Sequence, residues 1–183
     1  MRLVRSAVQL YSEQGYEATT VAQIAVGAGL TKATFFRHFP DKREVLFAGQ
    51  EEFSALLAAG IAAAPAEASV LDAVAAGLVA VTATFTPEQH EFGPRLAAAV
   101  AGSPELKERD ALKAVGLAVA VSDALVARGV PDATARLAGE MGVLAFKNGY
   151  GRWSDDDHGD AERLTWHTLA ALEDLRAAAA SLS

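Results

Sequence analysis

Glycine and proline divide this chain into segments of helical length, and that punctuation limits the fold more than any other feature. Between the breaks, alanine and leucine dominate, and the β-branched alternation typical of strands is scarce. Pro87, Pro104 and Pro131 each stand where the first turn of a helix would begin, a position that proline favours. The sequence therefore predicts an all-α protein of about nine helices.

Local capping signals give the expected helix bounds. Thr20 and Gln23 form a capping-box pattern, Thr31 and Asp41 are good N-caps, and Gly15 is a good C-terminal stop. The N-terminal part is expected to hold helices at about residues 2–14, 21–28, 32–38 and 42–63. The rest is expected to hold helices at about residues 69–84, 87–101, 104–128, 131–150 and 161–181.

Charge is distributed unevenly along the chain. The net charge of the 183 residues is −7, but residues 1–49 carry six basic and four acidic side chains, and the remainder carries ten basic and nineteen acidic ones. A mildly basic head on an acidic body would direct the head towards phosphate, although chance variation between the two parts is the alternative. Half of the residues are apolar, so a sizeable core is expected.

Residues 19–39 hold two short helical segments joined at Gly29 and Leu30, each opened by a threonine. This arrangement is typical of a helix-turn-helix, in which the second helix enters the major groove of DNA. The spacing predicts a small core between the helices, formed by Ile24, Ala25, Leu30, Phe35 and Phe39. The other side chains of the second helix are then expected to point outward.

This segment resembles the TetR-type repressors. The resemblance covers roughly residues 2–48 and lies in an ordered set of residues: Thr19-Thr20, Ile24-Ala25, Ala28-Gly29, Thr31 to Phe36, His38-Phe39, Asp41-Lys42 and Val45-Leu46. It implies a helix-turn-helix DNA-binding domain over residues 1–48 and a ligand-binding and dimerisation domain over residues 49–183. It also implies a repressor that binds a palindromic operator as a homodimer and is released by a small molecule.

The resemblance assigns DNA contacts residue by residue. Thr20 and Thr31 would bond phosphates at helix starts, and Lys32, Ala33, Thr34 and Phe36 would read base edges. Arg37, His38 and Lys42 would meet the backbone. The simpler interpretation is that Lys32 and Arg37 are solvated charges and that His38 is packed against Phe39.

Two departures from the family pattern concern DNA affinity. Phe36 stands where the family usually has tyrosine, and only Arg2 and Arg5 represent the basic arm that commonly precedes the first helix. Each lost phosphate contact lowers affinity and flattens its dependence on salt. The alternative function is therefore a helical small-molecule sensor or carrier with weak or lost operator binding.

The resemblance also implies an apolar effector cavity within the fourth to eighth helices. The candidate lining residues are Phe53, Leu57, Phe85, His90, Phe92, Leu96, Val121 and Phe146, each of which could equally be filled core. Apolar stripes on the last two helices predict a four-helix dimer interface, unless both stripes pack within their own subunit. The candidate interface residues are Leu137, Met141, Leu144, Leu164, Thr168, Leu169, Leu172 and Leu175.

Other chemistry finds little support in the sequence. No cysteine is present, four histidines are scattered, and no glycine-rich phosphate loop occurs, so we expect no enzyme, no cofactor and no metal site. The acidic run from Asp155 to Asp160 could hold a hard cation, but an exposed loop whose acids favour the start of the last helix is the preferred interpretation. Without a signal peptide or an expected membrane span, the prediction is a cytoplasmic protein.

Overall fold

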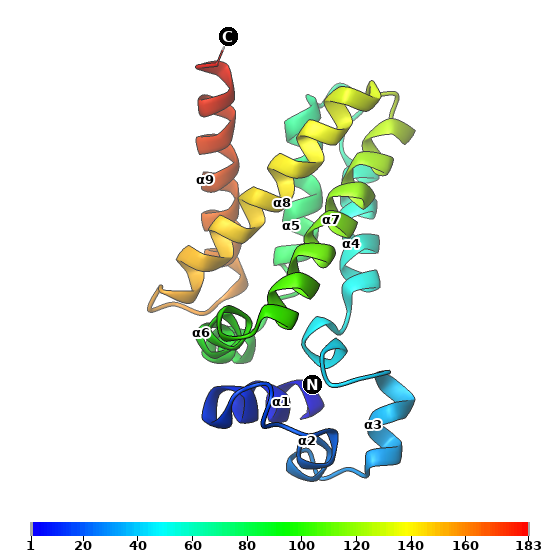
Figure 1. Cartoon of the computed structure of the whole chain (residues 1–183). Helices are drawn as coiled ribbons and strands as arrows, with labels where there is room; N and C mark the ends of the chain where they lie inside the picture. The colour runs from blue at the N-terminus through cyan, green and yellow to red at the C-terminus, as the bar shows by residue number, and fades with distance from the viewer. Residues whose placement is uncertain (1, 183) are drawn as a thin grey trace. The chain divides into compact units, whose positions relative to one another are not determined.

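The computed structural model describes residues 2–182, and within them it contains nine α-helices, one 3₁₀ helix and no strand (Figure 1). The predicted all-α fold is confirmed. By packing, the described residues divide into two compact units: residues 2–49 with 92–113, and residues 50–91 with 114–182. The predicted functional boundary after residue 48 remains a prediction, since packing also assigns residues 92–113 to the first unit.

The first unit is built around three short helices, α1 (Arg2–Gln14), α2 (Val21–Gly27) and α3 (Lys32–His38). Its core joins the apolar face of α1 to Ile24, Phe35 and the segment from Val45 to Phe47. The end of α6 (Pro87–Gly102) and the start of α7 (Pro104–Ala127) complete this core with Ala99 and Leu106. Gly15 ends α1 with φ +84°, as the stop signal predicts.

The expected fourth helix from Lys42 to Ala63 is wrong. The chain instead forms a 3₁₀ helix, η1 (Glu44–Phe47), and then α4 (Gln50–Ala63). Gly49 lies between them with φ +81°, a conformation that breaks helical geometry and favours glycine. Asp41 still acts locally as a cap, since its Oδ1 accepts hydrogen bonds from the backbone N–H groups of Arg43 (2.8 Å) and Glu44 (3.1 Å).

The second unit contains α4, α5 (Val70–Thr82), α8 (Asp132–Ser154), α9 (Ala161–Ala180) and most of α7. Helix α8 packs along α9, and α4 packs along α5. The α4–α5 crossing depends on a pair of glycines, because a Cβ atom on Gly60 would lie 2.7 Å from the Cα of Gly77. Fully buried aliphatic side chains fill the centre, among them Ile61, Val74, Val81 and Leu125.

Among the described residues, the segment Glu44–Ala63 is long and apolar enough to cross a membrane by length and composition alone. A core helix passes the same test. Here Gly49 interrupts the segment, and Leu57 and Ile61 are buried in the second unit.

Candidate nucleic-acid interface

Helices α2 and α3 each begin at a threonine whose hydroxyl caps the helix. The Thr20 hydroxyl oxygen accepts from the N–H of Gln23 (3.2 Å), and the Gln23 side chain accepts from the N–H of Thr20 (2.8 Å), so the predicted capping box is present. The Thr31 hydroxyl oxygen accepts from the N–H of Thr34 (3.1 Å). These caps fix where each short helix begins and leave both threonines exposed.

A tight turn separates the two helices. Gly29 adopts φ +67°, and the N–H of Leu30 donates to the carbonyl of Ala25 (2.8 Å). Ile24, Ala25 and Phe35 are completely buried between the helices, while Leu30 and Phe39 are half-buried. The predicted core is therefore present, and α3 is a separate rod rather than a continuation of α2.

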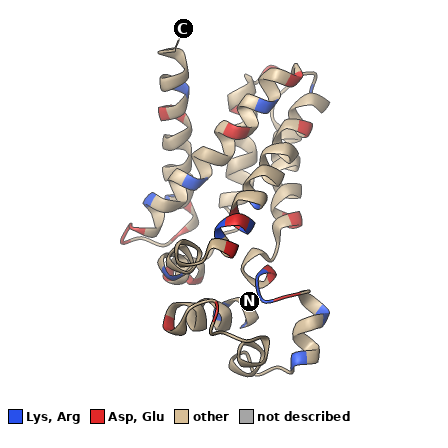
Figure 2. Cartoon of the chain, viewed as in Figure 1, with Lys and Arg blue, Asp and Glu red and all other residues tan. Residues whose placement is uncertain are grey.

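The outward face of α3 carries the predicted base-reading side chains. Lys32, Ala33, Phe36, Arg37 and His38 are exposed, and Thr34 is half-buried. The helix contains two cationic residues and no acid (Figure 2). Lys32 Nζ lies 5.8 Å from the centre of the Phe36 ring, so a cation and an exposed aromatic side chain share one face.

Lys42 has a different environment from the other predicted DNA contacts. Its Nζ donates to the backbone carbonyls of Tyr16 (2.7 Å), Thr19 (3.0 Å) and Glu17 (3.4 Å), and it lies 4.1 Å from the centre of the Tyr16 ring. The hydroxyl of Tyr11, whose pKa is raised by burial, donates to the Lys42 carbonyl (2.6 Å). Lys42 thus fastens the α1–α2 connection, and its predicted phosphate contact would compete with these bonds.

Replacing Lys42 by methionine is expected to destabilise the protein by about 1–2 kcal/mol, because the substitution removes charge-assisted bonds to three carbonyls. Urea unfolding of Lys42→Met against wild type measures the effect. Lys32→Met is the matched control, since Lys32 is exposed and its loss should leave stability within about 0.5 kcal/mol of wild type. If the Lys42→Met protein and this control are equally stable, Lys42 does not stabilise the α1–α2 connection.

Half of the predicted effector residues meet at one small cavity in the second unit. The cavity has a volume of about 10 Å³, enough for one water molecule at most. Phe53, Leu57, Val121 and Phe146 line it, and Phe85 packs against both phenylalanines at ring-centre distances of 5.9 Å. Four further lining residues were not predicted from the sequence: Leu78, Leu117, Gly142 and Val143. Helical spacing could have found most of them, because Leu117 precedes Val121 by four residues and Gly142 and Val143 precede Phe146 by four and three.

Three predicted effector residues lie elsewhere. Phe92 and Leu96 pack against the core of the first unit, so the structure does not bring them together with the residues that line the cavity. His90 lies in the second unit, where its Nε2 is 2.9 Å from the carbonyl oxygen of Trp153 and its ring packs edge-on to that indole.

The predicted dimer stripe is divided by burial. Leu164, Thr168 and Leu172 are at most 1% exposed within their own subunit, so their assignment to a surface for a second copy is wrong. Met141, Leu169 and Leu175 are half-buried. Leu137 and Leu144 on α8 are 61% and 46% exposed, and Trp166 on α9 is 58% exposed. On α8 the exposed Leu137 and Leu144 belong to the predicted stripe, whereas on α9 the exposed Trp166 lies outside it.

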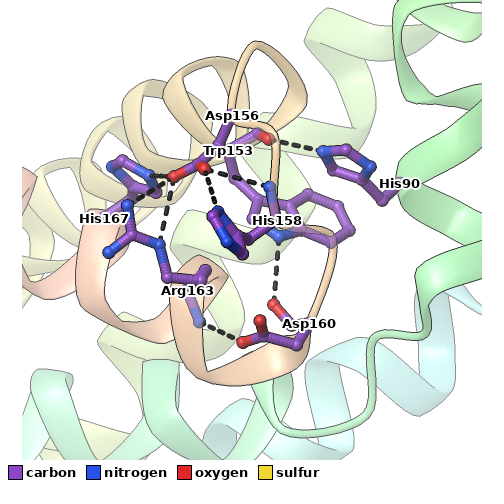
Figure 3. A network of polar contacts seen from close by, with 7 residues as sticks. All are labelled: His90, Trp153, Asp156, His158, Asp160, Arg163 and His167. Atoms are coloured by element: carbon purple, nitrogen blue, oxygen red, sulfur yellow. Dashed lines mark hydrogen bonds and ion pairs between the residues drawn. The ribbon is translucent and has the colours of Figure 1, made fainter.

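The acidic loop between α8 and α9 is organised by one carboxylate (Figure 3). Asp156 Oδ2 accepts from His167 Nε2 (2.7 Å) and Arg163 Nη2 (2.7 Å), and Oδ1 accepts from the N–H of His158 (3.0 Å). These bonds, from His167 first and Arg163 second, hold the pKa of Asp156 well below its usual value. Asp160 caps α9 by accepting from the N–H of Arg163 (2.8 Å). Asp156 and Asp160 thus tie the loop to the start of α9.

This network predicts an acid-sensitive contribution to stability. A carboxyl group whose pKa is lowered by folding stabilises the protein above its unfolded pKa of about 3.9, and the contribution is lost as the pH falls further. Asp156→Asn should therefore lower Tm at pH 7. The difference in Tm between the variant and wild type should become smaller as the pH falls to 3. Thermal unfolding at several pH values measures this. Asp157→Asn, at an exposed neighbour, is the control, and a gap that stays constant between pH 7 and pH 3 would contradict the prediction.

Comparison with known sequences identifies the N-terminal part. Residues 3–48 match the family described as bacterial regulatory proteins, tetR family. The chain is 38% identical over 80 residues to the HTH-type transcriptional regulator TcmR of Streptomyces glaucescens, an alignment covering 44% of this chain and 35% of that protein. It is 31% identical over 52 residues to the HTH-type transcriptional regulator YerO of Bacillus subtilis, covering 28% and 18%. The chain thus aligns with about a third or less of the length of these curated relatives.

Solved structures extend the likeness in fold to nearly the whole chain. A TetR-family transcriptional regulator from Rhodococcus sp. superposes with a TM-score of 0.54 at 20% identity, covering 94% of this chain and 95% of that one. The multidrug binding protein EbrR, solved in complex with imidazole, superposes with a TM-score of 0.52 at 20% identity, covering 93% and 92%. Residues 3–48, which contain the helix-turn-helix of α2 and α3, thus match the tetR family of bacterial regulatory proteins, and nearly the whole chain shares the fold of the solved TetR-type structures.

Proposed function

We propose that this chain is a ligand-responsive repressor that binds a palindromic operator as a homodimer and is released by a small molecule. The observation that carries the proposal is the exposed, acid-free face of α3, with Lys32, Phe36 and Arg37 outward on a helix that is separately capped and turned. Such a rod fits the major groove, where lysine can bond the O6 and N7 atoms of guanine and apolar groups contact the thymine methyl.

Exposed apolar side chains on α8 and α9 support the homodimer. Leu137, Leu144 and Trp166 leave large apolar areas in water, and pairing with a second copy would bury them. Two recognition helices related by a twofold axis read two half-sites, which is why the operator is proposed to be a palindrome. A repressor acts where its operator DNA lies, so the proposed site of action is the cytoplasm.

Helix α7 supports a route for the effector signal. The expected continuous helix from Lys42 into the ligand domain is interrupted at Gly49, so it cannot act as one rigid lever. Helix α7 runs unbroken from Leu106, which is buried in the core of the first unit, to Leu117 and Val121, which line the cavity. Arg109 Nε and Nη2 on the same helix donate to the two Glu44 carboxylate oxygens (2.7 and 2.9 Å). A ligand that prefers one of two arrangements of α7 would shift the DNA-binding population.

The test of the proposal is a salt series of fluorescence-anisotropy titrations with the DNA upstream of the chain's own gene and with a random duplex of equal length. Specific binding to the upstream DNA, with affinity falling linearly on a log–log salt plot, is the expected result. The alternative is a sensor or carrier with weak or lost operator binding, which is favoured by Phe36 lacking a phenolic hydroxyl. Equal affinity for both duplexes at every salt concentration would select that alternative.

A further inference from the structure

The cavity in the second unit is lined entirely by hydrocarbon. Its walls come from Phe53 and Leu57 on α4, Leu78 on α5, Leu117 and Val121 on α7, and Gly142, Val143 and Phe146 on α8. None of these side chains contains an oxygen or nitrogen atom. A cavity of this size and character holds no ordered water, since a buried water needs two to four polar partners.

Aromatic rings form part of the cavity lining. Phe53, Phe85 and Phe146 contact one another at ring-centre distances between 5.2 and 5.9 Å, and the cluster continues through Tyr150 to Trp153. Phe53 and Phe146 are half-buried, whereas the aliphatic lining residues Leu57, Leu78 and Val121 are at most 3% exposed. We therefore expect rotation of the two half-buried phenylalanines to enlarge the cavity, because the buried aliphatic side chains are held by close packing.

We infer that the effector enters this cavity with a neutral, apolar, ring-shaped group, and that an ionised group is excluded from it. A charge placed among these side chains would lose its water and find no counter-charge or hydrogen-bond partner on the lining. A flat apolar ring would instead meet the edges and faces of Phe53 and Phe146, an arrangement that aromatic pairs favour. A dry apolar cavity of about 150 Å³ accepts a benzene ring, so the rings must move before the ligand fits. This inference deepens the proposed function and rests on its assignment of the effector to the second unit.

The test uses the full chain and three probes with the same ring: toluene, benzoate and benzylammonium. Binding is measured by calorimetry and by the rise in Tm, without DNA. Toluene is expected to bind with half-saturation below 5 mM and to raise Tm, and both ions are expected to bind at least tenfold more weakly. Absence of toluene binding below 5 mM, or binding of either ion as tightly as toluene, would overturn the inference without any variant.

A pair of substitutions on α7 locates the site. Val121→Phe places a ring of the protein among the lining side chains and is expected to weaken toluene binding at least tenfold. Val126→Phe, at a position that is 41% exposed on the same helix, should bind toluene as wild type does. A folded Val121→Phe protein that binds toluene like wild type would overturn the inference. Operator affinity is measured separately, so a protein that binds its operator but not toluene refutes only the effector class. A protein that binds toluene but not its operator refutes only the proposed repressor function.

Discussion

Replacing Gly149 by alanine is expected to lower Tm by about 6–12 °C, which corresponds to a loss of about 3 kcal/mol for a chain of this size. Gly149 lies where α8 crosses α9, and a Cβ atom there would meet the Cα atom of Thr168 and come within 2.7 Å of its backbone nitrogen. Thr168 is fully buried. Backbone atoms cannot rotate away as a side-chain tip can, so the two helices would have to separate.

Gly151 provides the matched control on the same helix. It is exposed, and a Cβ atom built on it meets nothing within 4 Å. Gly151→Ala should therefore stabilise the protein by about 0.5–1 kcal/mol, because alanine loses less conformational freedom in a helix. Differential scanning calorimetry of both variants separates close packing from helix propensity. If both substitutions shift Tm in the same direction by similar amounts, the close-crossing argument fails.

The helix-turn-helix could be predicted from the sequence because its determinants are local. The Thr20 and Thr31 caps, the Gly29 turn and the spacing of Ile24 and Phe35 all act within a few residues, and each lies in the structure where the sequence analysis expected it. Caps and turns depend on the chemistry of neighbouring residues, so one sequence is sufficient to find them.

The break in the fourth helix was missed because tertiary packing overrode the local pattern. Val45, Leu46 and Phe47 are all buried, so three successive residues must face the core, which a helix with one apolar stripe cannot achieve. The 3₁₀ segment and the positive φ of Gly49 accommodate them. The position of Gly49 two residues after the last of these apolar residues was the available signal.

The roles of single charged residues were hidden for another reason. The carbonyls that Lys42 contacts lie 23 to 26 residues away in the chain, and Glu44 is separated from Arg109 by 65. Sequence spacing gives no information on such partners. The same holds for the last helix, where the periodicity identified an apolar stripe but could not show that Leu164 and Leu172 face their own subunit.

Replacing Lys32 by alanine is expected to weaken operator binding roughly ten- to a hundredfold, because a lysine that bonds a guanine edge contributes about 1–3 kcal/mol of discrimination. Lys32 is exposed at the first turn of α3, next to Phe36. Since the side chain would contact a base rather than a phosphate, the loss of affinity should be large for the operator and small for a random duplex. The variant should therefore reduce the ratio of specific to non-specific affinity.

Lys147→Ala is the matched control for Lys32→Ala, because it removes the same charge from an exposed position on α8 in the second unit. Anisotropy titrations with operator and random duplexes at two salt concentrations measure all four affinities for each variant. If Lys32→Ala weakens binding to both duplexes equally and reduces the slope of log affinity against log salt by about one, Lys32 contacts a phosphate instead. If Lys32→Ala and Lys147→Ala behave alike, the exposed face of α3 does not enter the groove, because removal of a groove-facing cation cannot equal removal of a distant one.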